Sequence, residues 1–173
     1  KKELTASRLP ADWQGWLAAV FGSYLRPPFA DYHAEAWEWA WAIRLGEPSP
    51  PFVAIWSRGF AKSSIAEAMC ARFAATGERS YALYVCSTQD RADDHVQNIA
   101  NLLESKTFAR HYPKAASRRV GKYGNSQGWR RQRLRTADGF TVDAIGLDTA
   151  ARGVKVDNTT EEGDAQGVRP DFL

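Results

Sequence analysis

A short segment of small, hydroxylated and basic residues has the clearest chemical potential in this chain. It resembles a degenerate form of the phosphate-binding pattern G-x-x-x-x-G-K-[ST], with Trp56 and Ala61 at the two glycine positions. In such a loop, backbone N–H groups at the start of a helix bind phosphate oxygens, and the helix dipole favours the anion. We therefore predict a nucleotide-binding site in the segment Ser57-Arg58-Gly59-Phe60-Ala61-Lys62-Ser63-Ser64.

The two cations of this segment favour an anionic ligand. Lys62 is predicted in the first turn of a helix, where the dipole disfavours a positive charge, and Arg58 adds a second charge nearby. We expect Lys62 to reach the β- and γ-phosphates of ATP and Ser63 to ligate Mg²⁺. Arg58 would contact the γ-phosphate, Gly59 would allow a tight turn, and Ser64 would support the loop. The alternative is a plain strand–turn–helix connection with an exposed lysine.

The elements around this segment are predicted to alternate between strands and helices. This order favours an α/β fold with a P-loop NTPase-type parallel sheet flanked by helices. An added β-hairpin is expected because Asp138-Gly139 is a strong turn signal. The predicted elements are a strand buried on both faces over 52–56, a helix over 62–76 ended by Gly77, a strand over 81–86, a helix over 90–105 capped by Ser87 or Thr88, and hairpin strands over 129–136 and 140–147.

Residues 1–50 are predicted to be a helical lead-in to an α/β core fragment over 52–173, all within one domain of 173 residues. Trp13, Trp16 and Phe21 recur at helical spacing, and a second helix is expected over 32–45 with Asp31 as its N-cap. Residues 157–168 are acidic and rich in turn formers, so we expect a mobile loop there.

A block of basic residues follows the predicted core elements. Residues 106–135 contain ten Lys or Arg residues and no Asp or Glu, which favours a polyanionic partner such as DNA. The alternative is a solvated surface. The residues that we expect to contact DNA are Arg118, Arg119, Lys122, Arg130 and Arg131.

The overall composition is that of an ordinary globular chain, with a net charge of +3 and 44% hydrophobic residues. No apolar run approaches the roughly 20 residues that a membrane span requires, and no signal peptide is recognisable. Cys70 and Cys86 have no metal-binding spacing, so we expect reduced thiols and a cytoplasmic location.

Several segments, in order, resemble the large terminase subunits of tailed phages. Residues 57–64 resemble the phosphate loop of that family, which tolerates a small residue before the lysine and often carries an arginine in the loop. Residues 84–96 are similar to its next strand and helix, and residues 129–153 resemble its hairpin region. Residues 169–173 look like the lead into its Walker B strand. The resemblance extends over residues 30–173.

The resemblance implies the ATP-hydrolysing motor domain that drives viral DNA into a capsid in the host cytoplasm. Lys62 and Arg58 would then be catalytic, and ATP and Mg²⁺ would be bound. The partners would be double-stranded DNA, the portal protein, the small terminase subunit and further copies in a ring. The Walker B carboxylates would follow residue 173, so this chain alone would hydrolyse ATP weakly or not at all.

Two other functions remain open from the sequence, another P-loop enzyme such as a helicase-like ATPase and a non-enzymatic nucleic-acid-binding module. Asp90, Asp93 and Asp94 also follow a predicted strand. We interpret them as acids that stabilise the first turn of a helix and not as Walker B carboxylates.

Overall fold

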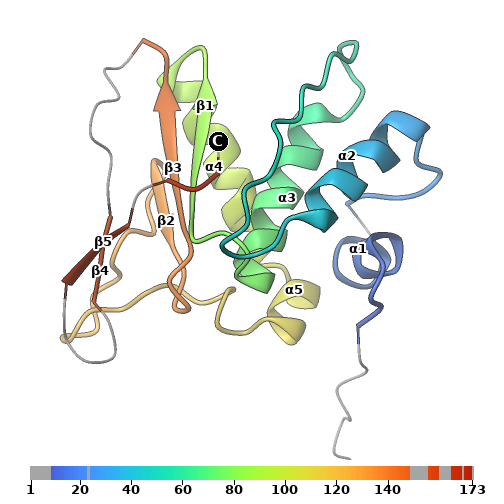
Figure 1. Cartoon of the computed structure of the whole chain (residues 1–173). Helices are drawn as coiled ribbons and strands as arrows, with labels where there is room; N and C mark the ends of the chain where they lie inside the picture. Colours follow the sequence, from blue (N-terminus) through green and yellow to red (C-terminus); the bar gives the residue numbers. More distant parts are fainter. Residues whose placement is uncertain (1–8, 23, 149–155, 160–164, 169, 173) are drawn as a thin grey trace, which may run out of the picture.

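The computed structural model describes residues 9–22, 24–148, 156–159, 165–168 and 170–172. Helices and strands follow one another as a mixed α/β chain (Figure 1). Among the described helices, none combines the length and apolarity needed to cross a bilayer. The elements are α1 (Trp13–Phe21), α2 (Asp31–Ala42), α3 (Lys62–Thr76), β1 (Tyr81–Cys86), α4 (Gln89–Leu103), α5 (Lys106–His111), β2 (Arg133–Arg135), β3 (Thr141–Gly146), β4 (Val156–Thr159) and β5 (Ala165–Val168).

The central sheet has three strands in the order β1-β3-β2. β1 and β3 are parallel, whereas β2 and β3 form the predicted antiparallel hairpin, with Leu134 opposite Val142. The first hairpin strand, predicted over 129–136, is limited to Arg133–Arg135. Gly139 adopts a φ of 100° in the turn. Glycine adopts a positive φ without steric strain, which is why Asp-Gly predicted a turn at this position. An α/β fold with a hairpin is thus confirmed, although the sheet is small and mixed.

Helices α3 and α4 pack together beside this sheet, and α4 also lies against β1 and β3 (Figure 1). The buried residues of α4 recur at helical spacing and include Ala92, Val96, Ile99 and Leu103. They share one core with side chains of β1 and β3, among them Ala82 and Val142. The predicted helices over 62–76 and 90–105 are therefore confirmed, with α4 displaced by one residue at its start and two at its end.

Helices α1 and α2 form the aromatic part of the core, where the rings of Trp13 and Trp37 stack with centroids 6.3 Å apart. The boundaries predicted for α2 were wrong by a few residues. Asp31 lies inside the first turn and Ala30 is the N-cap. The helix ends at Ala42 because Ile43 is extended, and the Arg44 guanidinium donates to the carbonyls of Trp41 and Ile43 at that end.

The strand predicted over residues 52–56 is not formed. The segment has no strand partner among the described residues, and Val53 and Ile55 are 75% and 91% exposed. Its two half-buried rings pack on α2: Phe52 lies 5.3 Å from Trp39, and Trp56 lies 5.1 Å from Tyr32, between ring centroids. An apolar run becomes a strand only when a neighbour accepts its backbone hydrogen bonds, and no described segment does so here.

The segment around Phe172 agrees with the predicted lead into a strand. Phe172 forms a parallel bridge with Ala82 of β1, and its carbonyl accepts a hydrogen bond of 2.8 Å from the Leu83 amide. The Asp171 carboxylate accepts from the backbone N–H groups of Ser80 and Tyr81. This contact lies on the edge of β1, because β3 pairs with its other side.

The prediction of a mobile loop over residues 157–168 was wrong for the described residues of that segment. β4 and β5 pair antiparallel, with Val156 opposite Val168 and Thr159 opposite Ala165. β-branched residues at these positions suit a strand, and the acidic composition of the stretch obscured that signal. Residues 160–164 lie outside the described part of the chain.

Candidate functional site

The loop over residues 57–61 leads directly into α3 and has two residues with positive φ. Gly59 has a φ of 88°, and Ala61 adopts the left-handed conformation with a φ of 54° immediately before the helix begins. A left-handed residue followed by a right-handed one points successive N–H groups to the same side and forms an anion-binding concavity. The loop therefore has the local backbone geometry that a phosphate requires.

The first turn of α3 adds further donors to this concavity. The N–H groups of Lys62, Ser63 and Ser64 precede the first intrahelical hydrogen bond, which Ile65 donates to the Ala61 carbonyl. Within the described residues, these three N–H groups have no other protein acceptor. Unpaired N–H groups at the positive end of a 15-residue helix favour an anion.

Lys62 bridges the two ends of the loop. Its Nζ donates hydrogen bonds of 2.6 and 2.8 Å to the carbonyl oxygens of Trp56 and Ser57. The side chain is half-buried, whereas the alternative of a plain strand–turn–helix connection assumed an exposed lysine. An ammonium group carries three N–H donors, and the third remains for an anion at the start of α3.

One side of the loop over residues 57–61 is accessible to solvent, and the other side contacts α2. A Cβ atom at Gly59 would meet nothing within 4 Å, and Arg58 and Phe60 are exposed. His33 Nδ1 accepts from the Ala30 N–H, so Nε2 carries the proton and donates to the Phe60 carbonyl at 3.2 Å. This hydrogen bond connects the loop to α2 and leaves Arg58 and Gly59 accessible to a ligand.

The two serines after Lys62 lie close to tyrosine hydroxyls. Tyr84 on β1 lies near Ser63, and Tyr24 after α1 lies near Ser64. Burial raises the pKa of both tyrosines above its ordinary value, so both phenols are protonated at neutral pH. The predicted Mg²⁺ ligand Ser63 therefore has a neutral phenol as its neighbour.

A buried carboxylate lies one turn below these serines, and the sequence-based prediction missed it. Glu67 is 2% exposed. Its Oε2 accepts from Tyr24 at 2.8 Å, and its Oε1 lies 2.6 Å from His95 Nδ1 and accepts from Asn98 at 3.0 Å. We call Glu67 with these three donors the Glu67 network. The only sequence signal for it is one acid in the otherwise apolar run 65–71.

The other acids near β1 have structural partners. Asp93 accepts from Gln89 within α4, and Asp94 pairs with Arg131 at 2.8 Å. Asp90 lies in the first turn of α4, as expected for an acid that favours the helix dipole. In the described ranges, no three His, Cys, Asp or Glu side chains gather to hold a metal ion.

A second polar cluster, also missed from the sequence, lies on the central sheet. Asp143 of β3 accepts from the Tyr81 hydroxyl and forms an ion pair with Arg133 of β2. Burial, together with Asp143, raises the pKa of Tyr81, and Asp143 raises the pKa of Arg133. These contacts join β1, β3 and β2, which indicates a structural role.

The predicted DNA-contacting residues fall into two groups. Arg118 pairs with Glu104 at 3.0 Å and lies over the Trp129 ring at 5.4 Å, and Arg131 pairs with Asp94. These acids belong to the α4 region, so a count of charges within residues 106–135 could not reveal the pairs. Lys122 and Arg130 are exposed, and Arg119 is half-buried.

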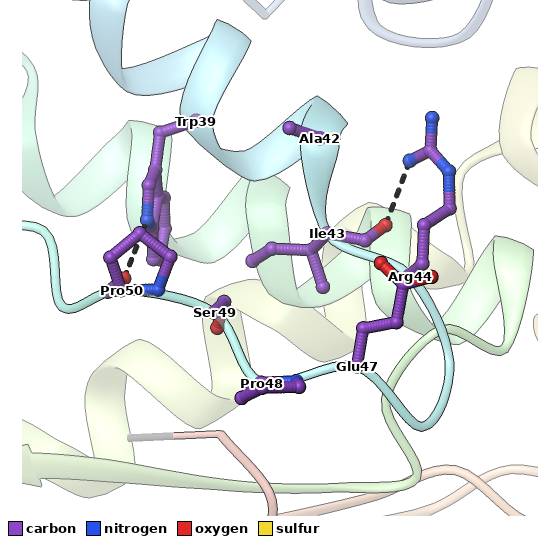
Figure 2. Close-up of a pocket in the computed structure, with 8 residues that line it drawn as sticks. All are labelled: Trp39, Ala42, Ile43, Arg44, Glu47, Pro48, Ser49 and Pro50. Carbon is purple, nitrogen blue, oxygen red and sulfur yellow. Dashed lines mark hydrogen bonds between the residues drawn. The ribbon is translucent and has the colours of Figure 1, made fainter.

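Two pockets of the described surface are lined by residues other than 57–64. The pocket in Figure 2, of about 110 Å³, lies between the end of α2 and residues 43–50, with Trp39 donating to the Pro50 carbonyl. It is smaller than a typical ligand site of about 300–1,000 Å³. A hollow of about 480 Å³ is lined by uncharged residues including Tyr24 and Asn98, which do not suit a phosphate.

Comparison of the chain with protein-family models, with curated proteins and with solved structures found no match.

Proposed function

We propose that this chain is a nucleotide-binding ATPase domain of the phage large terminase type. The observation that carries the proposal is the left-handed Ala61 placed directly before three unpaired N–H groups of α3, with the Lys62 ammonium across the loop. A backbone cradle, a helix dipole and a fixed cation are the three parts of a phosphate site. The ordered resemblance over residues 30–173 supports the more specific assignment.

In this proposal the loop binds the phosphates of ATP by backbone N–H groups and Lys62, and Ser63 contacts Mg²⁺. Exposed Arg58 stabilises negative charge on the γ-phosphate as water attacks in line. A carboxylate must also orient that water.

The proposed macromolecular partner is double-stranded DNA, contacted through the basic residues of 106–135. Lys122 and Arg130 are the best candidates because both are exposed, whereas Arg118 and Arg131 already pair with acids. A packaging motor would further contact a portal protein, a small terminase subunit and other copies of itself. We propose these partners from the resemblance alone.

Thermal unfolding with and without ligand tests the nucleotide site. MgADP or MgATP at about 100 times its Kd should stabilise the fold by about 2.7 kcal/mol. For a chain of this length that corresponds to a rise in Tm of about 5–10 °C. Lys62→Ala should abolish the rise. Since Lys62 donates to two loop carbonyls, each variant is compared with its own ligand-free Tm.

Lys114→Ala is the matched control, because Lys114 is exposed and lies outside the loop. It should retain the full nucleotide-dependent rise. A rise that persists in Lys62→Ala would place the nucleotide elsewhere. No rise in the unmodified chain would refute a nucleotide site and favour a nucleic-acid-binding module.

A further inference from the structure

We propose that residues 119–127 form a basic finger whose tip residue, Tyr123, stacks on an unpaired nucleic-acid base. The inference rests on the proposed DNA partner and is independent of nucleotide binding at residues 57–64. It adds a base-contacting residue to a region otherwise described only by its charge. The segment between α5 and β2, which contains the finger, extends away from α1–α3 (Figure 1).

Backbone hydrogen bonds anchor the finger to the sheet. The Arg119 N–H donates to the Arg135 carbonyl of β2 at 2.9 Å, and residue 118 forms an antiparallel bridge with residue 136. The Gln127 N–H returns to the Arg119 carbonyl at 2.7 Å. The finger is therefore attached at its base to an element that is itself part of the central sheet.

The tip is closed by a hydrogen-bonded turn. The Gly121 N–H donates to the Asn125 carbonyl, and the Gly124 N–H donates to the Gly121 carbonyl, both at 2.9 Å. Gly124 has a φ of 79°. A Cβ atom at Gly121 would lie 2.7 Å from the Gln127 side chain, so the two arms approach closely there. This backbone fixes where Tyr123 is presented.

Large side chains at the tip face solvent. Tyr123 is 86% exposed and Val120 is 63% exposed, so neither contributes substantially to the core. Trp129 is different, because it is half-buried under the Arg118 guanidinium. Tyr123 is therefore the aromatic ring of this region that is accessible to a ligand.

The charges around the tip indicate the chemical class of partner that the finger would bind. Exposed Lys122 is adjacent to Tyr123, and residues 106–135 contain no acid, so an anionic partner is favoured. The carboxylates of an acidic protein would pair with Lys122, but they would not interact with the exposed ring of Tyr123. A nucleic acid satisfies both groups, because phosphates pair with cations and bases stack on aromatic rings. Stacking on a ring requires a base that is not enclosed in a duplex, so Tyr123 would contact a single-stranded segment, whereas the cations would contact the phosphates of single and double strands alike.

Fluorescence anisotropy with a labelled 20-nucleotide oligo-dT and a duplex of equal length tests the proposal. Tyr123→Ala should weaken binding to the single strand about tenfold, whereas Tyr123→Phe should retain it. The slope of log K against log salt should be unchanged in Tyr123→Ala, because the ring is uncharged. Lys122→Ala should reduce that slope by about 0.7. Arg26→Ala is the control, because Arg26 is exposed and lies outside residues 106–135, and it should leave the affinity as it was.

These variants also show which part of the proposal is wrong if an expected result is not obtained. The Tm of Tyr123→Ala should match that of the unmodified chain, since the ring is exposed. Equal affinity of Tyr123→Ala and the unmodified chain for oligo-dT would overturn the stacking role. Binding to poly-glutamate as tight as to oligo-dT would overturn it in favour of an acidic protein. No DNA binding at low salt would refute the proposed DNA partner itself, whatever nucleotide does to the Tm.

Discussion

Replacing Glu67 should destabilise the protein more than replacing any exposed acid. In Glu67→Ala, the Tyr24 hydroxyl, His95 and Asn98 each lose a hydrogen-bond acceptor. A hydrogen bond contributes about 1 kcal/mol net. Tyr24 and Asn98 are exposed and His95 is half-buried, so water can reach these donors in part. We therefore expect a loss of about 2–3 kcal/mol in the free energy of unfolding, or about 4–12 °C in Tm.

Glu67→Gln removes the negative charge of the side chain but keeps its size and shape. The amide oxygen can still accept a hydrogen bond, but the amide NH₂ group would face a donor of the Glu67 network. The expected loss is about 1–2 kcal/mol. Glu104→Ala is the matched control, because Glu104 is 41% exposed and pairs with Arg118, which is 52% exposed. Such a surface pair contributes at most about 1 kcal/mol.

Urea unfolding followed by far-UV circular dichroism at pH 7.5 measures these differences. A loss below about 1 kcal/mol in Glu67→Ala would refute the reasoning, because it would mean that the three donors find water or other acceptors without cost.

Two further predictions concern the loop backbone and the cysteines. Ala61→Gly should leave stability unchanged or raise it by up to about 1 kcal/mol in urea unfolding, because glycine relieves the strain of a positive φ but costs backbone entropy. Ala61→Val should lose about 2 kcal/mol, and a harmful Ala61→Gly would argue against the left-handed conformation. Burial raises the pKa of Cys70 to about 12 from 9.0. The thiol therefore stabilises the fold fully below about pH 9, and this contribution is lost as the pH rises towards 12. At pH 8 a thiol-specific disulfide reagent should modify half-buried Cys86 well before fully buried Cys70; equal rates would contradict this order.

Local signals were sufficient for the elements that follow the candidate loop. The helix over 62–76 was predicted with its observed bounds, since Gly77 ends it with a φ of 72°. The strand over 81–86 and the hairpin turn at Asp138-Gly139 were also predicted correctly. The run 52–56 was not, because its apolar composition carries no information about whether a neighbouring strand is present.

The site was predictable only where it depends on the backbone. The position of Lys62 at the start of a helix follows from the sequence pattern. Its bonds to the carbonyls of Trp56 and Ser57 depend on how the loop folds back. The partners of Glu67 come from residues 24, 95 and 98, and such long-range pairings cannot be read from helical periodicity.

Helix α3 connects these features, because the same helix provides the first-turn N–H groups and carries Glu67. Glu67 lies one turn beyond Ser63 and Ser64, and its carboxylate accepts from three donors. Lys62 begins the helix, and Arg58 lies in the loop before it. A bound phosphate would therefore meet the N–H groups and cations first. The fold holds the acid within its own group of donors and not where it would repel the ligand directly.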